Sequence, residues 1–255
     1  MKTWMKPLAL GAVLALATAA CESGTDPDGI DDGALEAAAA LVAADGMFQD
    51  LNLMQSPGTW GGQAPGGPGG APIEVEGGTS FSKTVTFSPC PGSDVDYYHP
   101  TETSSMHIVA SHTRSVQHTF WTADVQRTRD MIVSGMCGEE TSRFWDGTSS
   151  GVVDKSRHRQ DGATRDFDMT TSAIFTAVER GVPREDFLYP LGGTIERTVD
   201  AILQKDGEVV REKHITFIIE FNGTNLVTMT DVATKETWDV DLSLRGVKGH
   251  LNKRP

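Results

Sequence analysis

Apolar and polar residues alternate along most of the chain between residues 80 and 244. In one run, apolar side chains occupy positions 215, 217, 219 and 221. Successive side chains of a strand point to opposite faces of a sheet, so this period of two indicates β-strands. Asp161-Gly162, Asp206-Gly207 and Asn222-Gly223 separate several of the runs, and such pairs favour tight hairpin turns. The pattern predicts a mainly β chain, an antiparallel meander of about nine or ten strands.

The predicted sheet has one apolar face and one face rich in hydroxyl and charged groups, as expected of a sheet that meets water on one side only. A sheet of this size must curl or be covered to bury its apolar face. We therefore expect a curved sheet, half-barrel or barrel with one N-terminal helix, and we favour the curved sheet or half-barrel.

In residues 33–54 the apolar residues recur with the period of a helix. The apolar residues that define one stripe follow steps of three and four positions and are Ala34, Ala37, Leu41, Ala44, Phe48 and Leu51. Gly46 weakens this helix by about 1 kcal/mol relative to Ala. Two interpretations remain open: the helix packs permanently on the β domain, or it is detachable and shields a binding surface.

Three further segments complete the division of the chain after residue 54. Residues 55–79 are rich in Gly and Pro and cannot bury enough surface to offset the entropy of ordering, so they are predicted to be a linker. Residues 80–244 form the antiparallel β domain. Residues 245–255 carry four basic side chains and are predicted to be a loose basic tail.

The first twenty residues have the features of a secretory signal peptide. Lys2 and Lys6 precede an apolar stretch that is shorter than the roughly 20 residues needed to span a bilayer, and small residues follow. Cys21 comes directly after Thr18-Ala19-Ala20, and the whole segment resembles the lipobox of bacterial lipoproteins. The resemblance implies that residues 1–20 are removed and that Cys21 carries a thioether-linked diacylglycerol. Residues 21–32 then consist of the lipidated cysteine and an acidic tether.

The same resemblance implies a location and a partner. The expected location is the bacterial cell envelope, with the membrane bound through the lipid anchor, because two acyl chains suffice for stable attachment. Glu22 after the anchor cysteine favours the outer over the inner membrane. In layout the chain resembles envelope lipoproteins without an assigned activity. Its architecture is also weakly similar to that of periplasmic lipoprotein carriers, whose curved sheet wraps a lipid.

Net charge and cysteine content bear on the possible partners and on the covalent structure. The formal net charge of −13 argues against a nucleic-acid partner, because phosphate contacts require Lys and Arg. Once Cys21 is lipidated, Cys90 and Cys137 remain, and exported proteins meet an oxidising compartment. We predict a disulfide between them; the alternative is two separate buried thiols.

Candidate catalytic and metal-binding groups are weak. Residues 147–151 match the G-x-S-x-G pattern, but a strand and not a helix is predicted after Ser149, which favours a hairpin loop over a nucleophile. His112 and His118 share a face of one predicted strand, with His107 opposite, and no carboxylate or cysteine completes a metal site. We therefore predict no catalytic residue, no metal and no cofactor.

These observations predict a non-catalytic, membrane-anchored lipoprotein that binds an apolar ligand or an envelope partner through its curved sheet. Two alternatives stay open: an anchored hydrolase with scattered catalytic residues, and a purely structural envelope protein.

Overall fold

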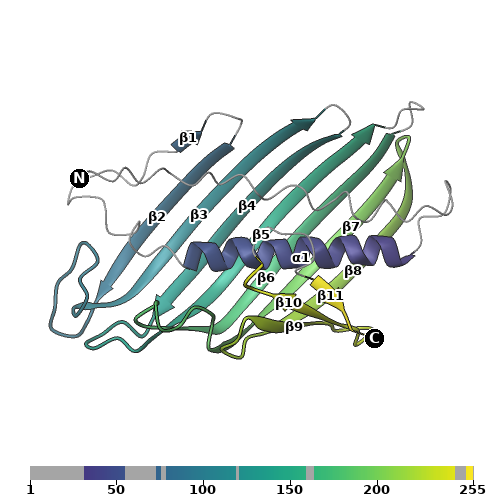
Figure 1. Ribbon diagram of the computed structural model, residues 1–255. Helices are drawn as coiled ribbons and strands as arrows, with labels where there is room; N and C mark the ends of the chain where they lie inside the picture. Colours follow the sequence, from purple (N-terminus) through teal and green to yellow (C-terminus); the bar gives the residue numbers. More distant parts are fainter. Residues whose placement is uncertain are drawn as a thin grey trace, which may run out of the picture.

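A single meandering sheet and one helix make up the fold in the computed structural model (Figure 1). The structure describes residues 32–54, 73–75, 79–118, 121–158, 164–244 and 251–254. The elements are α1 (Asp32–Met54), β1 (Ile73–Val75), β2 (Thr79–Pro89), β3 (Thr103–His118), β4 (Trp121–Ser134), β5 (Ser142–His158), β6 (Thr164–Gly181), β7 (Gly192–Lys205), β8 (Glu208–Glu220), β9 (Leu226–Asp231), β10 (Thr237–Asp241) and β11 (Leu251–Lys253).

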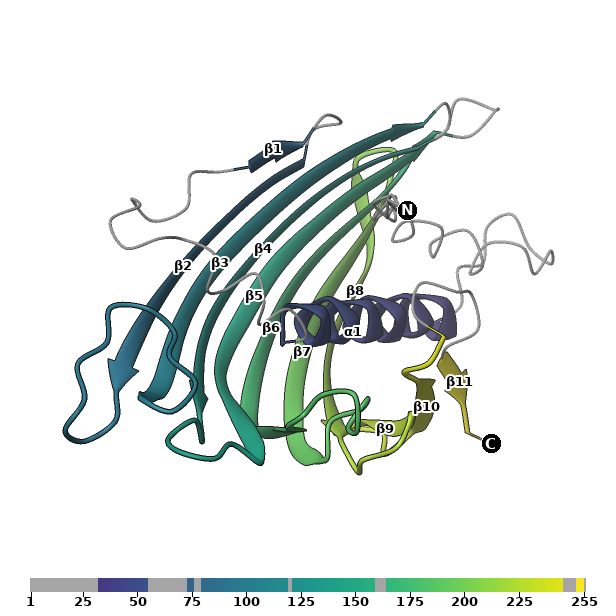
Figure 2. The same cartoon turned by 60° about the vertical axis from the view of Figure 1, so that its left-hand side comes forward.

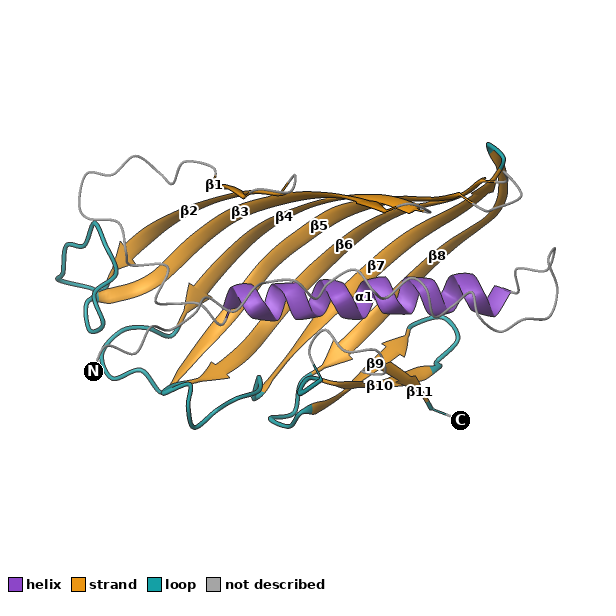
Figure 3. Ribbon diagram, turned by 45° about the horizontal axis from the view of Figure 1, so that its top comes forward, coloured by secondary structure: helices purple, strands orange, loops and turns teal. Residues whose placement is uncertain are grey.

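The eleven described strands follow one another in the sheet in chain order, and neighbouring strands are antiparallel. The sheet is curved and does not close into a barrel, and α1 lies across one of its faces (Figures 2 and 3). We call the face that carries α1 the inner face and the opposite one the outer face. The predicted meander and curved sheet are therefore confirmed.

Local chemistry explains the strands and one of their turns. Buried and accessible residues alternate along β7, for example, as a period of two requires. Asp206 and Gly207 join β7 to β8 with φ values of 53° and 85°, the positive angles that an Asp-Gly hairpin provides.

The core lies between α1 and the inner face. Small side chains, Ala39, Ala40, Ala43 and Ala44, are fully buried and allow the helix to approach the sheet closely. The buried surface of α1 differs from the predicted stripe, because Ala37 is exposed and Leu41 is only partly buried. The sheet curves around the helix and covers more than one side of it, so the sheet and not helical periodicity decides which residues are buried.

The predicted linker and the predicted loose tail each contain a short strand. Residues 73–75, within the predicted linker, pair with β2 as β1, because Ile-Glu-Val alternates as a strand does. Residues 251–253, within the predicted loose tail, pair with β10 as β11, where Lys253 Nζ lies 2.6 Å from Glu236 Oε2. The predictions for these two stretches were therefore wrong. Residues 1–31, which include Cys21, lie outside the described part of the chain.

Candidate functional site

A buried carboxylate fastens the helix to the sheet. Asp50, in the last turns of α1, has an exposed fraction of only 1%. One of its oxygens accepts a hydrogen bond from Arg129 Nε of β4 at 2.5 Å, and the other accepts one from Arg197 Nη2 of β7. Both arginines are themselves buried. The aspartate therefore joins three elements that are far apart in the sequence.

A third arginine lies beside this pair and is bound less completely. Arg127 of β4 is 5% exposed, and its Nη2 lies 3.7 Å from Asp45 of α1. Its buried Nε has no hydrogen-bond partner among the described residues. Gly46 makes room for these groups, because a Cβ there would lie 2.7 Å from Arg197 Nη1 and 2.8 Å from Arg127 Nη1. The glycine that looks like a defect in the helix is thus the point at which the guanidinium groups meet it.

The arginines set the titration of their neighbours. Burial acts to raise the pKa of Asp50, but the charges of Arg129, Arg197 and Arg127 outweigh it and hold the pKa below its usual value. Burial lowers the pKa of Arg127 to about 10. Burial also lowers the pKa of Lys83, on the inner face of β2, to about 8. Three arginines of the sheet, Arg127, Arg129 and Arg197, thus face two carboxylates of α1, Asp45 and Asp50.

Charge is segregated between the two faces of β2–β8. Strand register places the Lys and Arg of the paired positions on the inner face: Lys83, Arg114, Arg127, Arg129, Arg143, Lys155, Arg165, Arg180, Arg197, Lys205, Arg211 and Lys213. The outer face of the same strands carries the acids Asp124, Asp130, Asp146, Asp154, Asp166, Asp168, Glu196, Asp200, Glu212 and Glu220. The net negative charge of the chain thus coexists with a basic inner face.

Hydroxyl groups occupy the centre of the outer face. One continuous row crosses seven adjacent strands and consists of Ser82, Ser111, Thr128, Ser150, Ser172, Thr198 and Thr216. Two histidines on this face lie against carboxylates: His107 is 2.6 Å from Asp130, and His214 is 2.6 Å from Asp200. This composition is typical of a sheet face in contact with water.

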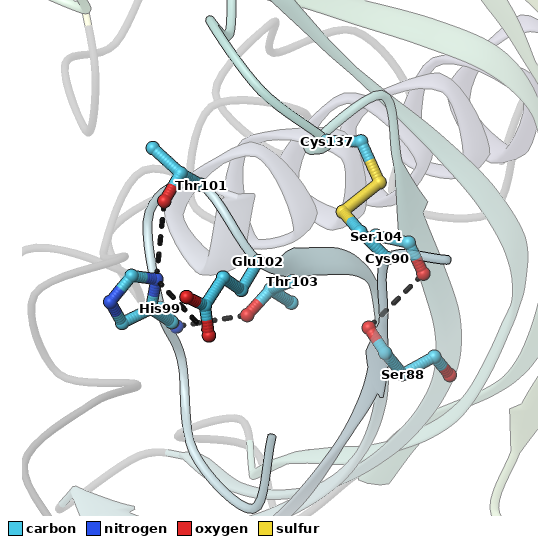
Figure 4. The surroundings of a disulfide bond; sticks show 8 residues. All are labelled: Ser88, Cys90, His99, Thr101, Glu102, Thr103, Ser104 and Cys137. Atoms are coloured by element: carbon cyan, nitrogen blue, oxygen red, sulfur yellow. Dashed lines mark hydrogen bonds and ion pairs between the residues drawn. A yellow bond between two sulfur atoms is a disulfide. The ribbon is translucent and has the colours of Figure 1, made fainter. Parts of the chain in front are cut away.

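The predicted disulfide is present. Cys90 follows β2 and Cys137 follows β4, and their Cα atoms are 5.9 Å apart (Figure 4). Nearby, Thr103 accepts a hydrogen bond from the backbone N–H of His99 at 2.8 Å. The disulfide ties the loop between β2 and β3 to the loop between β4 and β5, at one end of the sheet.

The candidate catalytic serine has no suitable surroundings. Ser149 lies within β5, 8% exposed, and its cross-strand neighbours are Arg129 and Ala173. The predicted hairpin loop at residues 147–151 was also wrong, because β5 continues through it. Gly147 makes this possible: it has a φ of 143°, and a Cβ there would lie 2.1 Å from the Asp130 carbonyl oxygen.

The candidate metal groups are not brought together. His107 and His112 lie on opposite faces of β3, as predicted, because their cross-strand partners belong to different faces. Asp166 and Asp168 share the outer face of β6. The described residues contain no group of three or more His, Cys, Asp or Glu side chains arranged to hold a metal ion. Within the same residues, no helix combines the length and the apolar character needed to cross a bilayer.

Sequence reasoning missed the ion pairs between α1 and the sheet. One signal was available: Arg127 and Arg129 stand two positions apart on a strand, at the positions that alternation assigns to the apolar face. A charge on a buried face implies a partner of opposite charge. The helix carries that partner, but its position in space follows only from the tertiary fold.

Comparison with known proteins gave no relative: no family model, no curated protein and no solved structure matches this chain.

Proposed function

We propose that this protein is a lipid-anchored bacterial envelope protein that binds an apolar ligand on the inner face of its curved sheet and catalyses no reaction. The observation that carries the proposal is the open sheet, whose apolar inner face is covered by one helix from outside the β domain. A closed barrel or a sheet packed on a second sheet would bury such a face permanently. A single helix before a Gly/Pro-rich segment gives a cover that can move.

The contacts of α1 define how the cover is held. The helix buries four alanines together with Leu35, Met47, Phe48, Leu51 and Met54, and its position is fixed by Asp50 between Arg129 and Arg197. Buried ion pairs specify one geometry without adding much net stability over an apolar contact. The ion pairs therefore fix where α1 lies, and a ligand that displaces the helix has to replace both these contacts and the buried apolar ones.

Ligand binding is tested by native mass spectrometry of the exported protein, purified with its lipid anchor. The expected result is a one-to-one complex with a co-purified lipid, and saturable uptake of an apolar probe such as 1-N-phenylnaphthylamine. Asp50→Asn should increase probe affinity by loosening α1, whereas Ala37→Ser, on the exposed side of the helix, should leave it unchanged. A protein without bound lipid and without saturable uptake would favour the structural alternative.

The anchor is tested separately. Replacement of Cys21 by Ser should abolish labelling by radioactive palmitate and release the protein from the membrane fraction, because the cysteine thiol is the proposed attachment point. Label that persists in the Cys21→Ser variant would show that the segment is not a lipoprotein signal.

A further inference from the structure

The part of the inner face between the arginines of β4 and the hairpin turn after β7 has an unusual composition. One cross-strand row reads Arg114, Val125, Val153, Met169, Ala201 and Lys213 from β3 to β8. The next row, closer to the turn, reads Val116, Ala123, Lys155, Phe167, Leu203 and Arg211 from β3 to β8. Two cations enclose the apolar residues of the first row, and Lys155 and Arg211 flank Phe167 and Leu203 in the second.

We call the apolar residues between these cations the apolar floor: Val125, Val153, Phe167, Met169, Ala201 and Leu203. The basic frame consists of the cations around it: Arg114, Lys155, Arg165, Lys205, Arg211 and Lys213. Arg165 and Lys205 are paired across β6 and β7 beyond the second row, so the frame also closes the floor towards the turn. All six cations are partly exposed, whereas Val125, Met169, Ala201 and Leu203 of the floor are buried, so acyl chains have to displace what covers them.

The arginine nearest this floor is under-coordinated. Arg127 follows Val125 on the same face of β4; its Nη2 lies 3.7 Å from Asp45, and Asp50 acts on its charge from farther away. Its Nε is buried without a hydrogen-bond partner among the described residues. The N–H donors of a buried guanidinium normally have hydrogen-bond partners, because a donor without one loses its hydrogen bonds to water and gains none from the protein. The geometry thus provides a donor for an anionic group at the edge of the floor.

We propose that the ligand of the inner face is an anionic phospholipid, with its phosphate beside Arg114 and Arg127 and its acyl chains on the apolar floor. This inference rests on the function proposed above and specifies the ligand class. A phosphodiester is chosen because it is permanently charged at neutral pH and accepts paired hydrogen bonds from guanidinium groups. The acidic outer face repels the same head group, so charge directs the lipid to the inner face.

Competition between two lipids with identical chains tests the proposal. The lipid-anchored protein is incubated with equimolar dioleoylphosphatidylglycerol and dioleoylphosphatidylcholine, and adducts are counted by native mass spectrometry. We expect the anionic lipid to dominate. Arg114→Gln with Lys155→Gln, the frame cations on β3 and β5, should reduce its binding by about ten- to a hundredfold, the loss expected from removing charge-assisted contacts. The matched control, Gln126→Glu with Ser172→Glu, changes the net charge equally at exposed outer-face positions and should have no such effect.

Each result has a distinct meaning. Equal binding of both lipids, or equal losses in the frame and control variants, overturns the head-group inference but leaves the proposed binding function standing. Absence of both adducts overturns the binding function itself. If the anionic lipid binds only after Glu22, Asp26, Asp28 and Asp31 are changed to amides, the frame is occupied by the acidic tether, and the lipid proposal is wrong.

Discussion

Replacement of Asp50 by Ala is the most direct test of how the helix is held. The carboxylate is buried and accepts hydrogen bonds from Arg129 Nε and Arg197 Nη2. Its removal leaves two buried guanidinium groups without their counter-charge and without acceptors. Water cannot easily reach them, because both arginines are at most 6% exposed.

The expected loss is large for one side chain. Breaking a buried ion pair by removing one partner costs about 3–5 kcal/mol. For a domain of this size, each kcal/mol changes Tm by about 2–4 °C, so Asp50→Ala should lower Tm by about 6–20 °C. Glu36→Ala is the control, because Glu36 of the same helix lies 3.5 Å from Lys253, whose side chain is 49% exposed. Its loss should cost about 1 kcal/mol or less.

Thermal unfolding followed by circular dichroism measures both variants, and urea unfolding gives the free energy. A third variant separates charge from packing: Asp50→Leu, Arg129→Met and Arg197→Met together replace the ion pairs with apolar side chains. Such a replacement is often neutral or stabilising, so the triple variant should recover much of the loss. A Tm for Asp50→Ala within 2 °C of the unmodified protein would refute the view that this carboxylate holds α1 on the sheet.

Three further predictions concern pH, the disulfide and the helix glycine. Because the arginines hold the pKa of Asp50 below its unfolded value, its stabilising contribution is present above about pH 4 and is lost as the pH falls through the folded pKa; acid titration of Asp50→Asn should lack this part of the loss. Reduction of the bond between Cys90 and Cys137, which are 47 positions apart, should lower the free energy of unfolding by about 4 kcal/mol, measured in urea with and without reductant; a change below 1 kcal/mol would contradict the chain-entropy argument. Gly46→Ala should destabilise the protein by about 1–3 kcal/mol although Ala favours helices, because the new Cβ meets Arg197; a higher Tm would show that the guanidinium group shifts freely.

Part of the candidate site could be predicted from local pattern. Alternation assigns Arg127 and Arg129 to the buried face of their strand, and the same alternation separates Glu196 from Arg197 on β7. The basic inner face and the acidic outer face are therefore encoded in the order of residues. Recognising the two faces requires the strand register, because the register decides which alternate residues of one strand share a face with which residues of the next strand.

By itself, the sequence determined the antiparallel meander, the helix that ends at Met54 and the Asp-Gly turn after β7, because each depends on side chains close together in the chain. Only the tertiary structure decided what α1 binds. Asp50 is 79 positions from Arg129 and 147 from Arg197, and the curvature of the sheet brings them together. The same curvature made Gly46 a contact point and not a defect, since the space around a residue depends on chain segments that local pattern does not contain.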